Sequence, residues 1–208
     1  MATVSSVYPY PIPARVGILL AAGRGSRYAA QRPGADKLLA PLPQGARVAA
    51  ASARTLRAAV EMVVAVVRPG SAALAGLLRA EDCVVLETDR AEEGMGASLA
   101  AAAQYLQGLP GTPATVLVAL ADMPWIQRAS LASVLEALRD APMAAPSYQG
   151  QRGHPVGFRG DLLAQLAALS GDEGARRLLK GPGLQLVPVD DPGVLRDVDT
   201  PADLDEDG

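Results

Sequence analysis

The feature that most constrains the fold is an alternation of short apolar stretches with longer segments of helical period. Alternation of this kind is typical of a parallel β-sheet with helices on its faces. The stretches of strand length are residues 16–20, 62–67, 83–86, 116–120 and 143–145. Helices are favoured between them, by apolar residues at spacings of three and four, at residues 46–59, 72–79, 96–107 and 130–139. The sequence therefore predicts an α/β fold with a doubly wound sheet.

The regular alternation ends near residue 142. Residues 142–158 hold two short apolar pieces around a polar turn with glycine, which favours a hairpin over another β–α–β unit. Beyond it the pattern predicts two helices and a strand, at residues 161–169, 173–180 and 184–189. The tail from residue 197 is interpreted as a short strand, a capped turn and a solvated acidic end.

Length and composition narrow the organisation and the partners. A chain of 208 residues is long enough for one well-buried α/β domain, so we expect an irregular leader at 1–15, one domain at 16–204 and an acidic tail at 205–208. We expect no membrane span and no signal peptide. A single cysteine, Cys83, excludes an internal disulfide and indicates the cytoplasm. The net charge of −3 offers no general attraction to nucleic acid or an anionic membrane, so any phosphate recognition is local.

A glycine-containing turn, LAAGRGSR at residues 20–27, follows the first predicted strand. It lacks the third glycine of the dinucleotide fingerprint and the Gly-Lys-Ser/Thr of the P-loop. It does offer backbone N–H groups, Arg24, Arg27 and a helix start, which together suit a triphosphate. A tight turn with both arginines in water explains the same residues. Lys37, one of only two lysines, is compatible with a surface position when taken alone, but with the loop it adds a mobile charge for phosphate.

Two acidic segments are candidate metal ligands. Asp122, in LADMP, follows the predicted strand at 116–120, where a carboxylate suits Mg²⁺ and equally suits an Asx-type turn cap. In RDVDTPADL, Asp197 and Asp199 flank one valine, and either Asp199 or Thr200 is a candidate helix N-cap. Asp199 becomes a second magnesium ligand if the chain returns to Asp122.

Three further segments each allow a functional and a structural interpretation. In GMGASL, the glycines let the backbone approach a ligand closely and Ser98 offers a hydroxyl group for a hydrogen bond. The same residues equally form an ordinary helix start with Ser98 in water. His154, the only histidine, is a turn residue or a substrate contact, with general-base chemistry the least supported role. In GDEGARRLL, Asp172 is a candidate N-cap that leaves Arg176 and Arg177 as surface arginines. No Ser-His-Asp or Cys-His pattern indicates an enzyme nucleophile.

These motifs together resemble a known family. LAAGRGSR with Lys37, GMGASL, LADMP, GHPVGF, GDEGAR and DVDTPADL, in this order, are similar to the molybdopterin nucleotidyltransferases, and most similar to their cytidylyl-transferring branch. The first loop is shared by many nucleotidyltransferases, whereas GHPVGF and GDEGAR are more specific. Residues 46–59 are less typical of the family. The resemblance implies a three-layer, Rossmann-like, mostly parallel sheet of the nucleotidyltransferase type.

The resemblance also implies a reaction and its site. CMP would pass from CTP to the terminal phosphate of molybdenum cofactor with release of pyrophosphate, with a recipient molybdoenzyme as a further partner. Mg²⁺ would be held by Asp122 and Asp199, and Arg27, Lys37 and Asp122 would carry the chemistry. Arg152, His154 and Arg176 would face the acceptor. The implied nucleotide-binding residues are Leu20, Ala21, Ala22, Gly23, Arg24, Gly25, Ser26, Lys37, Gly94, Gly96 and Ser98.

Base and acceptor remain open at this point. Ala21 and Ala22 stand where guanylyl-transferring relatives typically have two glycines, which favours CTP, although relatives with other nucleotides share the alanine pair. Alternatives are guanylyl transfer to molybdopterin, transfer to a sugar phosphate or phospholactate, and a non-catalytic protein that delivers the cofactor. Retention of Lys37, Asp122 and Asp199 together disfavours a mere binder, because binding alone requires no pair of metal-ligating acids.

Overall fold

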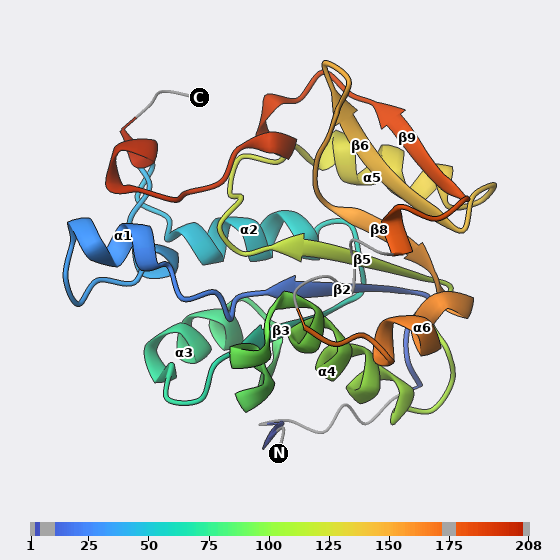
Figure 1. Ribbon diagram of the computed structural model, residues 1–208, viewed down its shortest axis with the longest axis horizontal. Helices are drawn as coiled ribbons and strands as arrows, with labels where there is room; N and C mark the ends of the chain where they lie inside the picture. The colour runs from blue at the N-terminus through green and yellow to red at the C-terminus, as the bar shows by residue number, and fades with distance from the viewer. Residues whose placement is uncertain (1–2, 5–10, 172–177, 206–208) are drawn as a thin grey trace.

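The chain folds into a mixed β-sheet between two layers of helices (Figure 1). The computed structural model describes residues 3–4, 11–171 and 178–205. The strand order is β1-β4-β3-β2-β5-β8-β6-β7, and β9 pairs with β6. This architecture confirms the prediction of a three-layer, Rossmann-like sheet.

The centre of the sheet is parallel. It consists of β2 (Arg15–Leu20), β3 (Met62–Val67), β4 (Val84–Glu87) and β5 (Thr115–Leu120). Strand β2 pairs with both β3 and β5, and all six residues of β3 are buried. Burial on both faces explains why these strands are continuous apolar runs without polar alternation. All four strands were predicted, with bounds that differ by one residue or less.

Helices cover both faces of the sheet. One face packs against α2 (Val48–Arg57), α3 (Ala72–Ala80) and α5 (Arg128–Ala137), with side chains such as Leu56, Leu78 and Val134 in one buried cluster. The other face packs against α4 (Met95–Gln107) and α6 (Leu163–Ala167), with Leu99, Leu106 and Leu166 in a second cluster. The short helix α1 (Ser26–Gln31) lies at the margin of the sheet (Figure 1).

The second half of the sheet is largely antiparallel. Strand β6 (Met143–Tyr148) pairs antiparallel with β7 (Gln151–Arg152) and with β8 (Val156–Arg159), which in turn pairs antiparallel with β5. These strands confirm the hairpin predicted at 142–158. Strand β9 (Leu184–Pro188) confirms the strand predicted at 184–189, and it pairs parallel with β6.

Several segments differ from the prediction. The leader, predicted to be irregular, includes the strand β1 (Thr3–Val4), which pairs antiparallel with β4. The helix predicted at 161–169 consists of a 3₁₀ turn, η3 (Gly160–Leu162), followed by α6. Most of the helix predicted at 173–180, including Arg176, lies outside the described residues, because residues 172–177 are not among them. Most of the acidic tail also lies outside them.

The short strand predicted at the start of the tail is wrong. Residues 196–200 form no strand, and the 3₁₀ turns η4 (Pro192–Leu195) and η5 (Pro201–Leu204) lie on either side of them. Their backbone N–H groups bind separate partners and not one neighbouring strand. The Val198 N–H donates to the Asp122 carbonyl, and the Asp199 N–H donates to the Asp203 side chain. Among the described residues, no helix combines the length and the hydropathy that crossing a bilayer requires.

Candidate functional site

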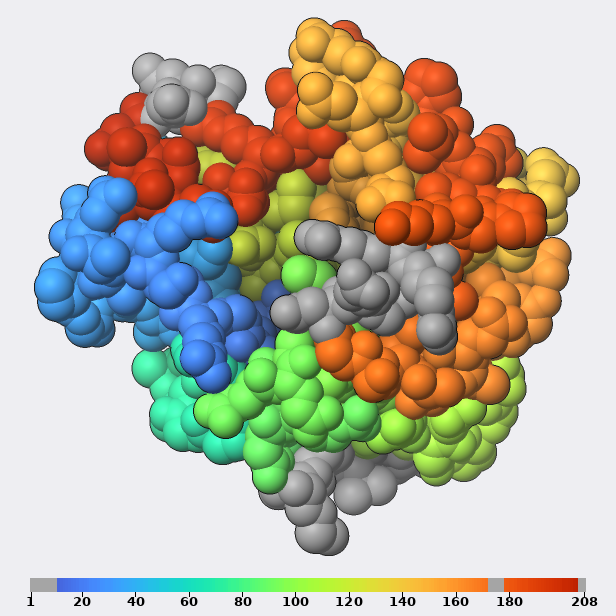
Figure 2. Space-filling view, viewed as in Figure 1, coloured from blue at the N-terminus to red at the C-terminus, as the bar shows by residue number. Residues whose placement is uncertain are grey.

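A cavity of about 350 Å³ opens beyond the carboxyl ends of β2 and β5. Ligands of open α/β sheets bind at this edge. In the space-filling view a hollow lies between the blue residues of the first loop and α1 and the red C-terminal segment, with yellow-green residues at its floor (Figure 2). The cavity is lined by Leu20, Ala21, Ala22, Gly23, Arg24, Lys37, Leu38, Ala91, Glu92, Gly94, Met95, Ser98, Leu120 and Asp122.

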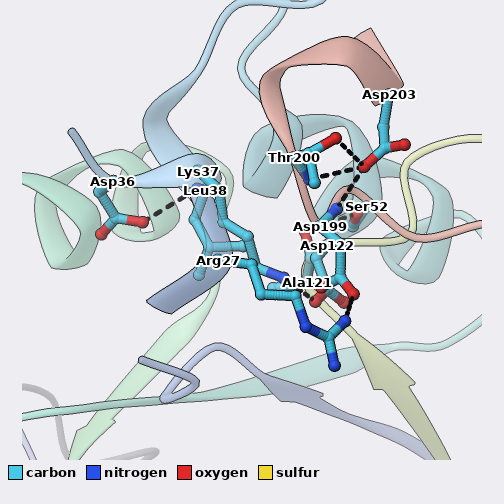
Figure 3. A network of polar contacts seen from close by, with 10 residues as sticks. All are labelled: Arg27, Asp36, Lys37, Leu38, Ser52, Ala121, Asp122, Asp199, Thr200 and Asp203. Carbon is cyan, nitrogen blue, oxygen red and sulfur yellow. Dashed lines mark hydrogen bonds and ion pairs between the residues drawn. The ribbon is translucent and has the colours of Figure 1, made fainter. Parts of the chain in front are cut away.

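Two cations and two carboxylates meet at the edge of this cavity (Figure 3). The Lys37 Nζ donates to Asp122 Oδ2 at 2.7 Å and to Asp199 Oδ1 at 3.3 Å. The second carboxylate oxygen of Asp199 accepts from the Arg27 guanidinium. Only 9% of the Lys37 side chain is exposed, against 74% of Arg27. The structure thus brings together the four charged residues that the sequence predicted as the reactive centre.

Local backbone structure fixes Lys37 in this position. It begins the 3₁₀ turn η1 (Lys37–Leu39), where the Asp36 side chain accepts from the Leu38 N–H at 2.9 Å. Gly25, directly before α1, has a φ of 56°, in the left-handed region where a side chain is unfavourable. Its Cα faces the Lys37 stem, because a Cβ built there would lie 3.5 Å from Lys37 Cγ. The first loop and Lys37 therefore form one packed unit.

The C-terminal segment carries Asp199 to the end of β5. The Val198 N–H donates to the Asp122 carbonyl at 2.8 Å. One carboxylate oxygen of Asp203 accepts from the backbone N–H groups of Asp199 and Thr200, at 2.9 and 2.6 Å, and from the Thr200 hydroxyl at 3.0 Å. Thr200 is the N-cap of η5, one of the two capping residues that the sequence allowed, and Asp203 completes a capping box. Asp199 is thus held from both sides by backbone contacts.

The charges at the centre are mutually stabilised. Burial alone would lower the pKa of Lys37, but hydrogen bonds to Asp122 and Asp199 and their negative charges raise it above its ordinary value. The pKa of Asp197 is also raised, by loss of solvation and by the negative charges of Asp199 and Asp122, but for a carboxyl group this disfavours the charged form. Lys37 therefore remains an ammonium at neutral pH, bound between two carboxylates.

The predicted nucleotide-binding residues divide into two groups. Those that line the cavity are Leu20, Ala21, Ala22, Gly23, Arg24, Lys37, Gly94 and Ser98. Gly25 and Ser26 lie behind them at the start of α1, and the Gly96 N–H is already bonded to the Gly171 carbonyl at 2.9 Å. Ser98 donates to the Gly94 carbonyl, which closes the first turn of α4. The motif GMGASL therefore begins a helix, as one of its two interpretations predicted, and Gly94 and Ser98 also line the cavity, while their contact with a ligand stays a prediction.

Two of the residues expected to face an acceptor, Arg152 and His154, lie on the antiparallel half of the sheet or on its connections. Arg152 is exposed on β7. His154 lies two residues further on, and its backbone N–H donates to the Val194 carbonyl at 2.9 Å. Burial and the positive charge of Arg152 lower the pKa of His154 to about 4, although the charge of Asp122 acts in the opposite direction. His154 is therefore neutral at pH 7, and its buried Nδ1 has no hydrogen-bond partner among the described residues.

Sequence reasoning missed several cavity residues. Leu38, Ala91, Glu92, Met95 and Leu120 also line the cavity. Met95 and Leu120 lie within GMGASL and LADMP, Leu38 follows Lys37, and Ala91 and Glu92 shortly precede GMGASL, so proximity to these motifs was the available signal. Ala91 and Glu92 also border a second hollow of about 520 Å³, at the carboxyl ends of β3 and β4.

The carboxylates of Asp122 and Asp199 suit a hard divalent cation that also binds phosphate. Asp122 and Asp199 direct one oxygen each at a single positive atom, the Lys37 Nζ. Magnesium characteristically uses one or two carboxylates and completes its shell with phosphate and water. No group of three or more His, Cys, Asp or Glu side chains in the described part of the chain could hold a metal. The residues therefore fit a cation that arrives with a phosphate ligand.

Comparison with known proteins gives similar proteins that cover nearly the whole chain. Purine catabolism protein PucB of Bacillus subtilis (strain 168) is 29% identical over 204 residues, which cover 93% of this chain and 95% of PucB. Among solved structures, Rv0371c of Mycobacterium tuberculosis H37Rv has a TM-score of 0.76 at 24% identity, with 92% of this chain and 95% of that chain covered. Rv0371c has also been solved in complex with manganese.

A nucleotidyl transferase from Methanothermobacter thermautotroptrophicus superposes with a TM-score of 0.74 at 23% identity, with 91% of this chain and 94% of that chain covered. Structural similarity at this level of identity establishes the fold. The family is established by the sequence itself, because residues 17–189 match the MobA-like NTP transferase domain. This chain belongs to the family of MobA-like NTP transferase domains.

Proposed function

We propose that the protein transfers CMP from CTP to the terminal phosphate of molybdenum cofactor and releases pyrophosphate. The observation that carries the proposal is the meeting of Lys37, Arg27, Asp122 and Asp199 beside a cavity walled by the first loop. In this reaction an acceptor phosphate oxygen attacks the α-phosphorus of the nucleotide, and the bond to pyrophosphate breaks. The protein needs to orient two anions and offset their charge, and needs no nucleophile of its own.

The first loop is suited to the triphosphate. Its residues Ala22, Gly23 and Arg24 line the cavity, and Lys37 borders the same space. Backbone N–H groups and the two side-chain cations supply fixed and mobile positive charge for phosphate oxygens. Arg27, mostly exposed at the rim, adds a planar guanidinium that suits bidentate contact with phosphate.

Asp122 and Asp199 are the residues that would hold Mg²⁺. When bound, the ion supplies Lewis-acid stabilisation of the charge that develops on the phosphoryl oxygens. Ser52 secures the strand end that carries Asp122, since its hydroxyl donates to the Ala121 carbonyl at 2.9 Å and the Ala121 N–H donates to the Leu20 carbonyl at 3.0 Å. Asp122 thus projects from a strand end that is held by α2 on one side and by β2 on the other.

The alanine pair supports the choice of cytidine. Ala21 and Ala22 are both buried and both line the cavity. Their two methyl groups occupy space that two glycines would leave open, which narrows the cavity toward a pyrimidine. The resemblance to the cytidylyl-transferring branch points the same way.

Arg152 and His154 are proposed to face the acceptor, together with Arg176. Arg152 offers a positive charge for an acceptor phosphate. His154, neutral at pH 7, offers a hydrogen bond without adding a charge. The name of PucB connects that relative with purine catabolism. For this chain, the proposed destination of the product is a recipient molybdoenzyme.

A nucleotide panel tests this function. Purified protein is given Mg²⁺, molybdenum cofactor and one of CTP, GTP, ATP or UTP, and pyrophosphate release is measured with and without the cofactor. We expect release with CTP, much less with GTP, and none without the acceptor. Release with GTP alone would redirect the proposal to guanylyl transfer. A second series replaces molybdenum cofactor by a sugar phosphate, and release only in that series would replace the acceptor. No release with any nucleotide in either series would overturn an enzymatic function.

A further inference from the structure

The two aspartates of the centre are already neutralised by side chains of this chain. Lys37 bridges Asp122 and Asp199, and Arg27 binds the remaining oxygen of Asp199. Two negative and two positive groups sum to zero charge. The side chains of Lys37 and Asp122 are 9% and 20% exposed, so water weakens this interaction much less than it weakens a surface ion pair.

A divalent cation and the Lys37 ammonium compete for the same oxygens. A cation held by Asp122 Oδ2 and Asp199 Oδ1 would take the two acceptors that Lys37 now uses, and at that distance the two positive charges repel. Lys37 also lines the cavity, and its four-carbon stem lets the ammonium move from carboxylate to phosphate. Triphosphate oxygens would give Lys37 and Arg27 new partners and would supply further ligands to the cation.

We propose that Lys37 and Arg27 are internal counter-ions that keep the Asp122–Asp199 pair closed to free divalent cations until a triphosphate draws both side chains away. Cation and nucleotide then bind as one unit, and neither alone occupies the centre tightly. The inference rests on the proposed function only in taking Asp122 and Asp199 as the cation ligands.

Binding of Mn²⁺ to the protein without nucleotide tests the inference. The free Mn²⁺ signal in electron paramagnetic resonance is titrated for the wild type, Lys37→Met and Lys180→Met. Lys180 is the only other lysine and is exposed, so its variant controls for the loss of one positive charge. We expect Lys37→Met to bind Mn²⁺ at least about tenfold more tightly than the wild type, and Lys180→Met to match the wild type. Equal affinity of Lys37→Met and wild type would overturn the inference.

The effect of a triphosphate on Mn²⁺ affinity is measured in the wild-type protein, so that no substitution can affect folding. Inorganic tripolyphosphate is the probe, with its own Mn²⁺ binding subtracted. We expect it to tighten Mn²⁺ binding to the wild-type protein at least about tenfold, and to tighten binding to Lys37→Met much less. Mn²⁺ binding that is equally tight with and without tripolyphosphate in the wild type contradicts the counter-ion role.

Two further variants locate the effect. Lys37→Met combined with Asp122→Asn should lose the gain in Mn²⁺ affinity, because one of the two carboxylates is gone. Lys37→Gln repeats the test if circular dichroism shows that Lys37→Met is unfolded. The outcome is independent of the nucleotide panel: absent pyrophosphate release with a tenfold gain in affinity rejects the proposed reaction alone, and release without that gain rejects the counter-ion role alone.

Discussion

At the scale of single residues, the meaning of each charged side chain depends on partners that are remote in the sequence. Lys37 is 85 residues from Asp122 and 162 from Asp199. The composition identified Lys37 as unusual and the motif LADMP identified Asp122, but no local pattern indicates that the chain returns Asp199 to the end of β5. In the structure the return is fixed by a backbone hydrogen bond from the Val198 N–H to the Asp122 carbonyl and by burial of the Val198 side chain in the core. The local patterns therefore predicted the residue types, while only the family resemblance implied that these residues meet in one site.

Removal of the Asp122 carboxylate should affect turnover more than folding. We expect Asp122→Ala to lower the rate of pyrophosphate release by about 100-fold or more, the scale of losing a main electrostatic stabiliser of the transition state. The measurement is steady-state release from CTP with saturating acceptor. Asp190→Ala, at an exposed aspartate away from the centre, serves as the control and should retain wild-type turnover. Near wild-type turnover in Asp122→Ala would remove this carboxylate from the reactive centre.

At the scale of elements, the segment between β7 and β8 is clamped against η4. The Gly153 N–H donates to the Pro146 carbonyl at 2.8 Å, and the His154 N–H donates to the Val194 carbonyl. A Cβ built on Gly153 would lie 2.3 Å from the Val194 carbonyl oxygen, closer than real atoms approach. Glycine is thus required at 153 by the approach of the backbone of η4, and this contact joins the hairpin to the segment that carries Asp199.

A pair of glycine substitutions tests this clamp. Gly153→Ala should lower the free energy of unfolding by about 1–3 kcal/mol, because either η4 or the hairpin must move. Gly76→Ala is the matched control: Gly76 lies inside α3 with open space around it, so alanine should raise the free energy of unfolding by about 0.5–1 kcal/mol. Urea unfolding measures both. An unchanged free energy of unfolding in Gly153→Ala would show that η4 and the hairpin can move apart without loss of stability.

The elements that could be predicted are those whose burial is regular. Strand β3 is a continuous apolar run, and helix α4 has apolar residues at helical spacing, so length and spacing identify each of them. Residues 196–200 could not be predicted correctly, because the apolar Val198 between two acids resembles a strand while its N–H is taken by a carbonyl at the end of β5. The first loop was predicted in position, and only part of its length lines the cavity, while its role in binding a triphosphate stays a prediction.

At the scale of the whole molecule, His154 links folding stability to pH. Its pKa is lowered in the folded protein to about 4 from an ordinary value of 6.5, chiefly by burial. The unfolded chain therefore takes up a proton at a pH where the folded chain does not, and the stabilisation present above pH 6.5 is lost as the pH falls toward 4. Charged groups such as Asp197, whose pKa is raised, contribute with the opposite sign.

Comparison of the wild type with His154→Gln isolates this contribution. Between pH 7 and pH 4 the wild type should lose about 3 kcal/mol more of its free energy of unfolding than the variant. Urea unfolding at several pH values provides the measurement, and the difference between the two proteins cancels the groups that they share. Parallel loss of stability in both proteins would mean that His154 titrates normally when folded.

The division of the sheet into a parallel and an antiparallel half has a consequence for divergence among relatives. The first loop, Lys37 and Asp122 stand on elements of the parallel half, whereas Arg152 and His154 stand on the antiparallel β7 and on its connection to β8. The ladder between β5 and β8 is the seam, and it depends on backbone groups that tolerate most substitutions. Substitutions beyond the seam can therefore change the proposed acceptor contacts while the parallel strands that precede Lys37 and Asp122 keep their pairing.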